Sequence, residues 1–189
     1  MNDSDTLAPQ YFEAIGKVVV AFQSLEESVT FGLIRLTRHN PEEDIDLDYV
    51  LALSEMPFKG RTKLMRNHLE RVKPEKFLYP TSPHPDKRPE FIRELIDKLK
   101  TSTAACDKME EERNQYMHSI WSSSGNEGEL VARRYKLRVQ PKKTTVTDEE
   151  VPLQKILDLV VRMRDCREMI STCTEFLASV LIDKRSAAN

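Results

Sequence analysis

The chain has 189 residues, the size of one ordinary domain, and can bury a hydrophobic core without metal or disulfide cross-links. Its 29 basic and 31 acidic residues nearly cancel, so a nucleic-acid partner would have to meet a local basic patch. Three cysteines without a CxxC pair argue against a disulfide framework and a zinc site, and five glycines without a GxGxxG or Walker-type pattern argue against the usual phosphate-binding loops.

The first predicted element is a long amphipathic helix over residues 11–37. Its apolar residues recur at steps of three and four, which is the period of a helix with one buried face. This stripe consists of Phe12, Ile15, Val19, Phe22, Val29, Leu33 and Leu36. Val20, Phe31 and Ile34 widen it, so we expect a central helix or one that forms a dimer face.

The next elements are shorter. An acidic segment, residues 41–48, is predicted as a loop, and two helices follow over 49–55 and 59–72, separated at Pro57. Five of the ten prolines then fall between Pro74 and Pro89, too many for a helix or a central strand. We therefore expect a surface connection over residues 73–89.

The spacing of apolar residues changes twice in the second half of the chain, from helical to alternating and back to helical. Pro89 suits the first turn of a long helix that should reach Trp121, where the residues SSSGNEG follow. Alternation of apolar and basic residues over 130–147 predicts a β-hairpin that turns near Pro141. A last long helix is predicted over 151–182, with Cys166 and Cys173 on its core side.

Together these elements predict a single, mainly α domain over residues 1–189 with an inserted β-hairpin. The chain starts MNDSDTLAPQ, without the basic and apolar stretches of a signal peptide, and contains no run of 18 apolar residues. We therefore expect a cytoplasmic protein without a membrane partner.

One cluster in the long helix that follows Pro89 has residues suited to chemistry. Arg113 is spaced by sevens from Leu99, Cys106 and Ile120, which places it in line with predicted core residues. Asn114 and His118 are four apart and therefore neighbours on a helix surface. Arg113 and His118 are about 140° apart around an ideal helix, so only the long arginine side chain can bring both groups to one phosphate.

Such a cluster can support RNA cleavage without a metal or cofactor. A neutral histidine can accept the proton of the ribose 2′-hydroxyl that attacks the adjacent phosphate. An arginine can bind two phosphate oxygens and stabilise the charge of the transition state, while an asparagine supplies an orienting hydrogen bond. A single histidine does not easily act as both base and acid, which favours two copies of the cluster meeting across a twofold axis.

The run Arg113-Asn114, three residues, His118 resembles the motif of the HEPN (higher eukaryotes and prokaryotes nucleotide-binding) superfamily. The resemblance implies an antiparallel bundle of four to five helices, a homodimer and, in many members, a metal-independent ribonuclease of defence or toxin–antitoxin systems. It implies that Arg113 and His118 are catalytic, that Asn114 supports them, and that an antitoxin or other protein is a partner. Ile120 stands where members paired with nucleotidyltransferases can carry tyrosine, so adenylylation is not implied.

Other interpretations stay open. Arg61 and His68 also fit a loose form of the motif. Arg113 can instead pair with a glutamate at 110 or 112, and His118 can be a core histidine bonded to the backbone. The protein would then be a catalytically inactive bundle that binds a protein or RNA partner.

The hairpin is a second candidate for RNA binding. Between residues 130 and 147 six residues are basic and none is acidic, namely Arg133, Arg134, Lys136, Arg138, Lys142 and Lys143. Such a hairpin can follow a phosphate backbone. The alternative, which we favour from sequence, is a solvated strand face whose lysines protect a sheet edge.

Overall fold

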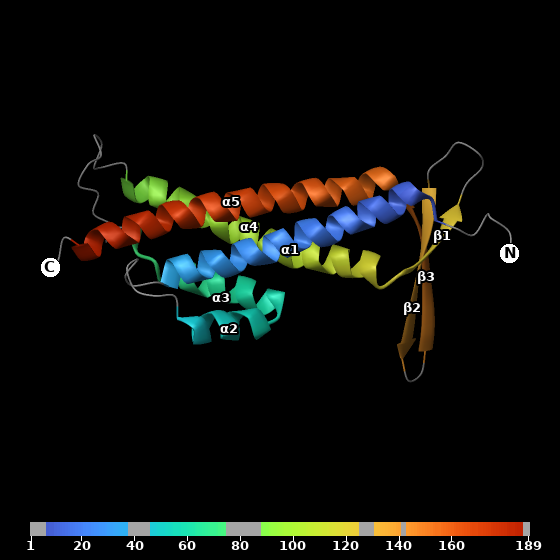
Figure 1. Ribbon diagram of the computed structural model, residues 1–189, viewed down its shortest axis with the longest axis horizontal. Helices are drawn as coiled ribbons and strands as arrows, with labels where there is room; N and C mark the ends of the chain where they lie inside the picture. The colour runs from blue at the N-terminus through green and yellow to red at the C-terminus, as the bar shows by residue number, and fades with distance from the viewer. Residues whose placement is uncertain (1–6, 38–45, 75–87, 125–130, 141–142, 187–189) are drawn as a thin grey trace. The chain divides into compact units, whose positions relative to one another are not determined.

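A computed structural model describes residues 7–37, 46–74, 88–124, 131–140 and 143–186 of the chain (Figure 1). In chain order its elements are α1 (Pro9–Thr37), α2 (Leu47–Glu55), α3 (Phe58–Arg71), α4 (Arg88–Met117), β1 (Ile120–Ser124), β2 (Val131–Gln140), β3 (Lys143–Pro152) and α5 (Leu153–Ser186). The prediction of a mainly α protein with a β insertion is confirmed. No helix within the described ranges combines the length and apolar character that crossing a bilayer requires.

The chain forms two compact units, each described on its own. The first, here called the sheet unit, comprises residues 1–23 and 109–164, and the second, the helical unit, comprises residues 24–108 and 165–189. The division falls within α1, α4 and α5, each of which contributes to both units. That the chain is a single domain stays a prediction.

The helix boundaries near the middle of the chain follow local capping. Asp46 caps α2, because its Oδ1 accepts hydrogen bonds from the backbone N–H groups of Asp48 and Tyr49 at 3.0 and 3.2 Å. The end of the acidic segment is therefore helical and not loop. Pro57 separates α2 from α3 as predicted. Residues 75–87, most of the predicted proline-rich connection, lie outside the described residues.

The helices of the helical unit are joined by polar contacts as well as by their core. Arg61 of α3 binds Glu26 and Thr30 of α1, both at 2.8 Å. Asp107 of α4 accepts hydrogen bonds from two residues of α3, Arg66 at 2.9 Å and Thr62 at 2.6 Å. These partners show α3 lying between α1 and α4.

The directions of these helices differ in part from the antiparallel bundle that the resemblance implies. Phe91 of α4 contacts Phe176 of α5, and Cys106 lies beside Cys166, so α4 and α5 are antiparallel. Ser28 of α1 bonds with Ser171 of α5, and four residues later Gly32 meets Thr174, so α1 and α5 run parallel.

The C-terminal end of α4 differs from the prediction. The helix ends at Met117, and the chain then forms β1, in which Ile120 pairs with Tyr135 and Trp121 with Arg134 of β2. Ile120, expected in the core stripe, is 70% exposed. The indole N–H of Trp121 donates to the Tyr116 carbonyl at 3.0 Å, which satisfies one of the free carbonyls at the helix end.

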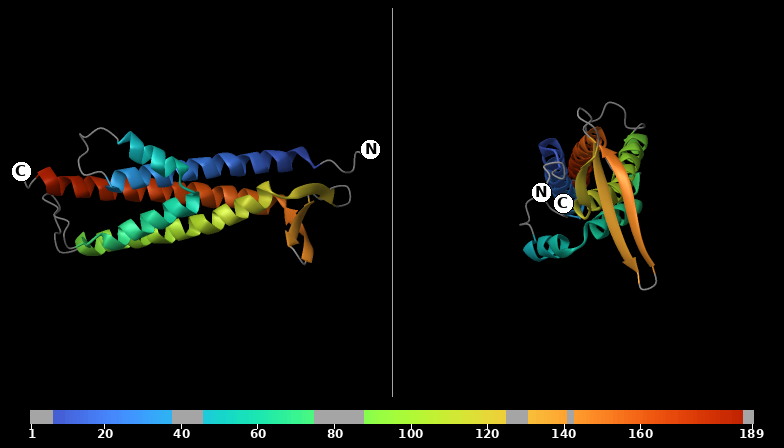
Figure 2. Two further views of the ribbon diagram at one scale, coloured as in Figure 1. Left: turned by 90° about the horizontal axis from the view of Figure 1, so that it is seen from below. Right: turned by 90° about the vertical axis from the view of Figure 1, so that its right-hand side faces the viewer.

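The predicted hairpin is confirmed and is part of a three-stranded antiparallel sheet in the order β1-β2-β3. Figure 2 shows β2 and β3 as a long ribbon, paired from Val131↔Pro152 to Gln140↔Lys143. Because β3 extends to Pro152, α5 begins two residues later than predicted. The predicted turn at Pro141 lies outside the described residues.

Tyr11 joins α1 to this sheet. Its side chain is 1% exposed, and its hydroxyl donates to the Val151 carbonyl at 3.0 Å while accepting from the Ala132 N–H at 3.1 Å. Ala132 and Val151 face each other across β2 and β3, so the hydroxyl bridges two buried backbone groups of the ladder. The buried stripe of α1 thus starts at Tyr11, whereas Phe12, expected in the core, is 60% exposed.

Removal of the Tyr11 hydroxyl should destabilise the protein. We expect Tyr11→Phe to lower the free energy of unfolding by about 1–3 kcal/mol, because two buried backbone groups lose a partner. Urea denaturation measures the change. Tyr49→Phe is the control: its hydroxyl makes no hydrogen bond with the rest of the described chain, so its loss should matter little. Equal stability of Tyr11→Phe and wild type would contradict the bridging role.

Gly32 packs closely against other helices of the helical unit. A Cβ atom there would lie 2.9 Å from Met65 Cε and 3.0 Å from Thr174 Cγ2, whereas a Cβ at Gly16 would meet nothing within 4 Å. We expect Gly32→Val to lower the unfolding free energy by roughly 1–3 kcal/mol. Gly16→Val should stay within about 0.5 kcal/mol of wild type. Thermal denaturation compares them, and equal effects would argue against close packing at Gly32.

Candidate active site

The candidate site lies in the sheet unit, where α4 ends. Arg113 and Asn114 are in its last two turns, and His118 is the first residue after it. The His118 backbone N–H donates to the Asn114 carbonyl at 3.1 Å, so the helical turn continues through His118. The neighbour relation predicted for Asn114 and His118 is therefore kept, although the helix is shorter than expected.

Arg113 is half-buried and carries a charge that no described carboxylate neutralises. Its Nη1 donates to the Asn114 side-chain carbonyl at 2.7 Å, and its guanidinium carbon lies 5.0 Å from the ring centroid of Phe22. No carboxylate among the described residues pairs with it, and its buried Nε has no hydrogen-bond partner there. A cation held by an amide and an aromatic ring keeps its charge available for an anion.

His118 is exposed, and none of the residues that the structure describes hydrogen-bonds to its imidazole. The interpretation of His118 as a core histidine bonded to the backbone is therefore wrong. The alternative pairing of Arg113 with Glu110 or Glu112 is also wrong, because no described carboxylate pairs with Arg113. Glu112 instead binds Arg162 of α5 through both carboxylate oxygens, one of them at 3.0 Å. Neither of these two alternatives therefore accounts for Arg113 or His118 within the described residues.

The second match to the loose motif has a structural role. Arg61 pairs with Glu26, and the side chain is only 11% exposed. His68 Nε2 lies 3.1 Å from the Leu36 carbonyl oxygen, at the other end of the α1–α3 contact. These two residues hold α3 against α1, so Arg113 and His118 are the better candidates for a site.

Glutamates of β3 neutralise part of the positive charge of the hairpin. Arg134, a candidate for RNA binding or for a solvated strand face, is 6% exposed; its guanidinium forms an ion pair with Glu149 and donates to Gln115 Oε1 at 3.1 Å. Arg133 is exposed and pairs with Glu150 at 3.3 Å. Lys142 lies outside the described residues, as do the side chains of Lys136, Arg138 and Lys143. Arg134 is thus a structural residue, and the RNA-binding prediction for it is corrected.

Sequence reasoning missed the ion cluster around Glu149. Lys155 at the start of α5 contacts Glu149 at 2.7 Å, while Arg134 binds the other carboxylate oxygen. The hydrogen bond from Lys155, followed by that from Arg134, lowers the pKa of Glu149. Arg134 also lies over Tyr116, 5.9 Å from its ring centroid. The cluster therefore connects β2, β3, α4 and α5 next to the candidate site.

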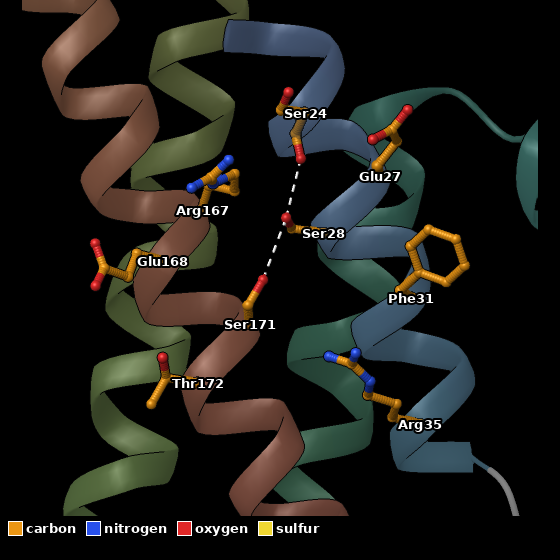
Figure 3. Close-up of a pocket in the computed structure, with 9 residues that line it drawn as sticks. All are labelled: Ser24, Glu27, Ser28, Phe31, Arg35, Arg167, Glu168, Ser171 and Thr172. Atoms are coloured by element: carbon orange, nitrogen blue, oxygen red, sulfur yellow. Dashed lines mark hydrogen bonds between the residues drawn. The ribbon is translucent and has the colours of Figure 1, made fainter.

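A hollow of about 310 Å³ opens between α1 and α5 of the helical unit (Figure 3). Its floor is polar: Ser171 Oγ donates to Ser28 Oγ at 3.3 Å, and Ser28 Oγ donates to the Ser24 carbonyl at 2.9 Å. Charged side chains of both signs, Arg35 and Glu168 among them, surround it. None of the predicted site residues lines this hollow, and two of its hydroxyls, those of Ser28 and Ser171, are bonded to each other.

The described parts of the chain contain no group of three or more His, Cys, Asp or Glu side chains arranged as metal ligands. No family model, curated protein or solved structure matches the chain. The function is therefore argued from the residues and their geometry.

The Glu149 cluster predicts an acid-sensitive fold. A glutamate whose pKa is lowered on folding stabilises the protein above its unfolded pKa, and this contribution is lost as the pH falls below about 4. We expect Glu149→Gln to be less stable than wild type at pH 7, because Arg134 stays buried without its carboxylate, and the difference to shrink in acid. Chemical denaturation at several pH values measures both effects.

Glu13→Gln is the control for this pH series. Glu13 pairs with Lys17 at 2.6 Å and its pKa is also lowered, but the pair lies on the exposed surface of α1. A surface pair contributes little, so this variant should follow the wild-type pH profile. If Glu13→Gln and Glu149→Gln behaved alike, the cluster would have no special importance for stability.

Proposed function

We propose that the protein is a metal-independent endoribonuclease of HEPN type that acts as a homodimer. In this proposal Arg113 and His118 are catalytic and Asn114 orients Arg113. The observation that carries it is the half-buried Arg113 guanidinium, which is bonded to Asn114 and lacks a carboxylate partner among the described residues. A cation in the last two turns of α4 that no described carboxylate neutralises is suited to binding a phosphate.

The chemistry proposed for this site is transfer of the phosphate to the neighbouring 2′-hydroxyl. His118 accepts the 2′-hydroxyl proton, the oxygen attacks phosphorus, and the bond to the 5′-oxygen breaks, which leaves a 2′,3′-cyclic phosphate. Arg113 donates hydrogen bonds to the non-bridging oxygens, whose negative charge grows in the transition state. The Asn114 side chain holds one end of the guanidinium at 2.7 Å and limits its orientations.

The proposal includes a second copy of the chain. The departing 5′-oxygen must take up a proton while His118 is removing one from the 2′-hydroxyl, and each site offers a single histidine of the motif. Two chains related by a twofold axis supply both groups. Exposed apolar side chains of α1 in the sheet unit, Phe12 at 60% and Val20 at 63%, are candidates for this contact.

The biological context is part of the proposal as well. An RNase of this kind would act in the cytoplasm on RNA, in defence or as a toxin controlled by an antitoxin or other protein partner. The same exposed residues, Phe12 and Val20, also favour the second candidate, a catalytically inactive bundle that binds a protein partner.

His118→Ala tests the proposal directly. Purified wild type should cleave total RNA in the presence of EDTA, and the variant should lose at least about 100-fold in rate, because it lacks the proton acceptor. Arg113→Lys should also lose cleavage, since an ammonium group lacks the two-pronged geometry of a guanidinium. Gel electrophoresis and mass spectrometry of the products, with detection of a 2′,3′-cyclic end, measure the reaction.

His84→Ala is the matched control, a histidine outside both the motif and the described residues, and it should cleave like wild type. Circular dichroism should show equal helix content in all variants, because Arg113 and His118 are not part of the buried core. Undiminished cleavage by His118→Ala would overturn the assignment. Absence of cleavage by wild type would favour the binding module.

A further inference from the structure

Two buried cysteines from distant parts of the sequence meet in the helical unit. Cys106 of α4 and Cys166 of α5 are separated by 60 residues, and their Sγ atoms lie 3.5 Å apart. Cys106 is 0% exposed and Cys166 is 8% exposed. The sequence, with three cysteines and no CxxC pair, gave no sign of this contact.

The distance between the sulfurs is close to what a covalent link requires. A disulfide has its sulfurs about 2.05 Å apart, so a movement of roughly 1.5 Å along the existing contact would form the bond. Both thiols are on long helices that already pack side by side, antiparallel, through Cys106–Cys166 and Phe91–Phe176. The link would therefore join helix segments that are already in contact.

The two thiols are not equivalent. Cys166 donates to the Ser102 carbonyl at 3.2 Å and shares a hydrogen bond with Cys106. This bond lowers the pKa of Cys166, while the same bond and burial raise the pKa of Cys106. Cys166 is thus both the better nucleophile and the more accessible thiol.

We propose that Cys106 and Cys166 form a reversible redox site at which hydrogen peroxide converts the two thiols into a disulfide between α4 and α5. The Cys166 sulfur attacks one peroxide oxygen, the O–O bond breaks, and the leaving hydroxide takes up the thiol proton to give water and a sulfenic acid. The Cys106 sulfur then attacks the Cys166 sulfur, the S–O bond breaks, and a second water leaves with the Cys106 proton. Two thiols are oxidised by two electrons, and one peroxide is reduced to two waters.

This site is separate from the proposed ribonuclease, since neither thiol is among the residues assigned to RNA cleavage. Cys173 provides an internal control on the same helix. It is 2% exposed, and its Sγ donates to Met169 Sδ at 3.5 Å, with no thiol beside it in the described structure. The geometry therefore assigns one particular pairing out of the three that three cysteines allow.

The test is mass spectrometry of the intact full-length protein after treatment with hydrogen peroxide and alkylation in denaturant. Reduced protein should gain three alkyl groups and oxidised protein only one, and digestion without reduction should yield peptides joined through Cys106 and Cys166. Dithiothreitol should restore three reactive thiols. The melting temperature of the oxidised form should rise by roughly 10 °C, since the cross-link closes a long loop.

The variants decide between this pairing and others. Cys173→Ala should still form the link and gain no alkyl group after oxidation, whereas Cys106→Ala should form no internal disulfide and should gain no thermal stability from peroxide. Three alkyl groups on peroxide-treated wild type would overturn the proposal. A link through Cys173, or disulfide dimers on a non-reducing gel, would overturn it too.

Discussion

The ion pair between Arg134 and Glu149 is the constraint on which the sheet unit depends. A guanidinium that is 6% exposed requires a carboxylate and further hydrogen bonds, because an unpaired buried charge is strongly unfavourable. Glu149 and Gln115 satisfy it, and Lys155 binds the same carboxylate. Since Gln115 lies between the Arg113–Asn114 pair and His118, the cluster fixes the turn of α4 that presents the candidate site.

Most helices were predictable because their apolar residues repeat at helical spacing and their ends carry local signals such as Pro57 and Pro89. The end of α4 was not, because Ile120 fits both a stripe spaced by sevens and a β-strand. Only pairing with Tyr135 of β2, a distant segment, decides between these states. The contact between Cys106 and Cys166 depends in the same way on how α4 packs against α5.

Arg61 and Arg113 show why a short motif does not identify a site by itself. Each is followed by a histidine at a spacing that fits the loose motif. Helical periodicity alone does not tell which of the two matches is a site. Arg61 is neutralised by Glu26, and its motif partner His68 contacts a carbonyl of α1. Arg113 instead lies over Phe22 with an amide as its neighbour. A carboxylate partner gives Arg61 a structural role, and Arg113 has none among the described residues. Arg134 has a structural role for the same reason, because its partner Glu149 lies just beyond the basic stretch 130–147.

The single tryptophan of the chain has an optical consequence. Trp121 lies three residues after His118, half-buried, with its ring centroid 5.9 Å from that of Tyr116 and 6.5 Å from that of Tyr11. Its fluorescence, excited directly or by energy transfer from these tyrosines, reports on the sheet unit alone. Far-ultraviolet ellipticity instead follows the helices of both units. Separate midpoints for emission and ellipticity would therefore reveal two units that unfold independently.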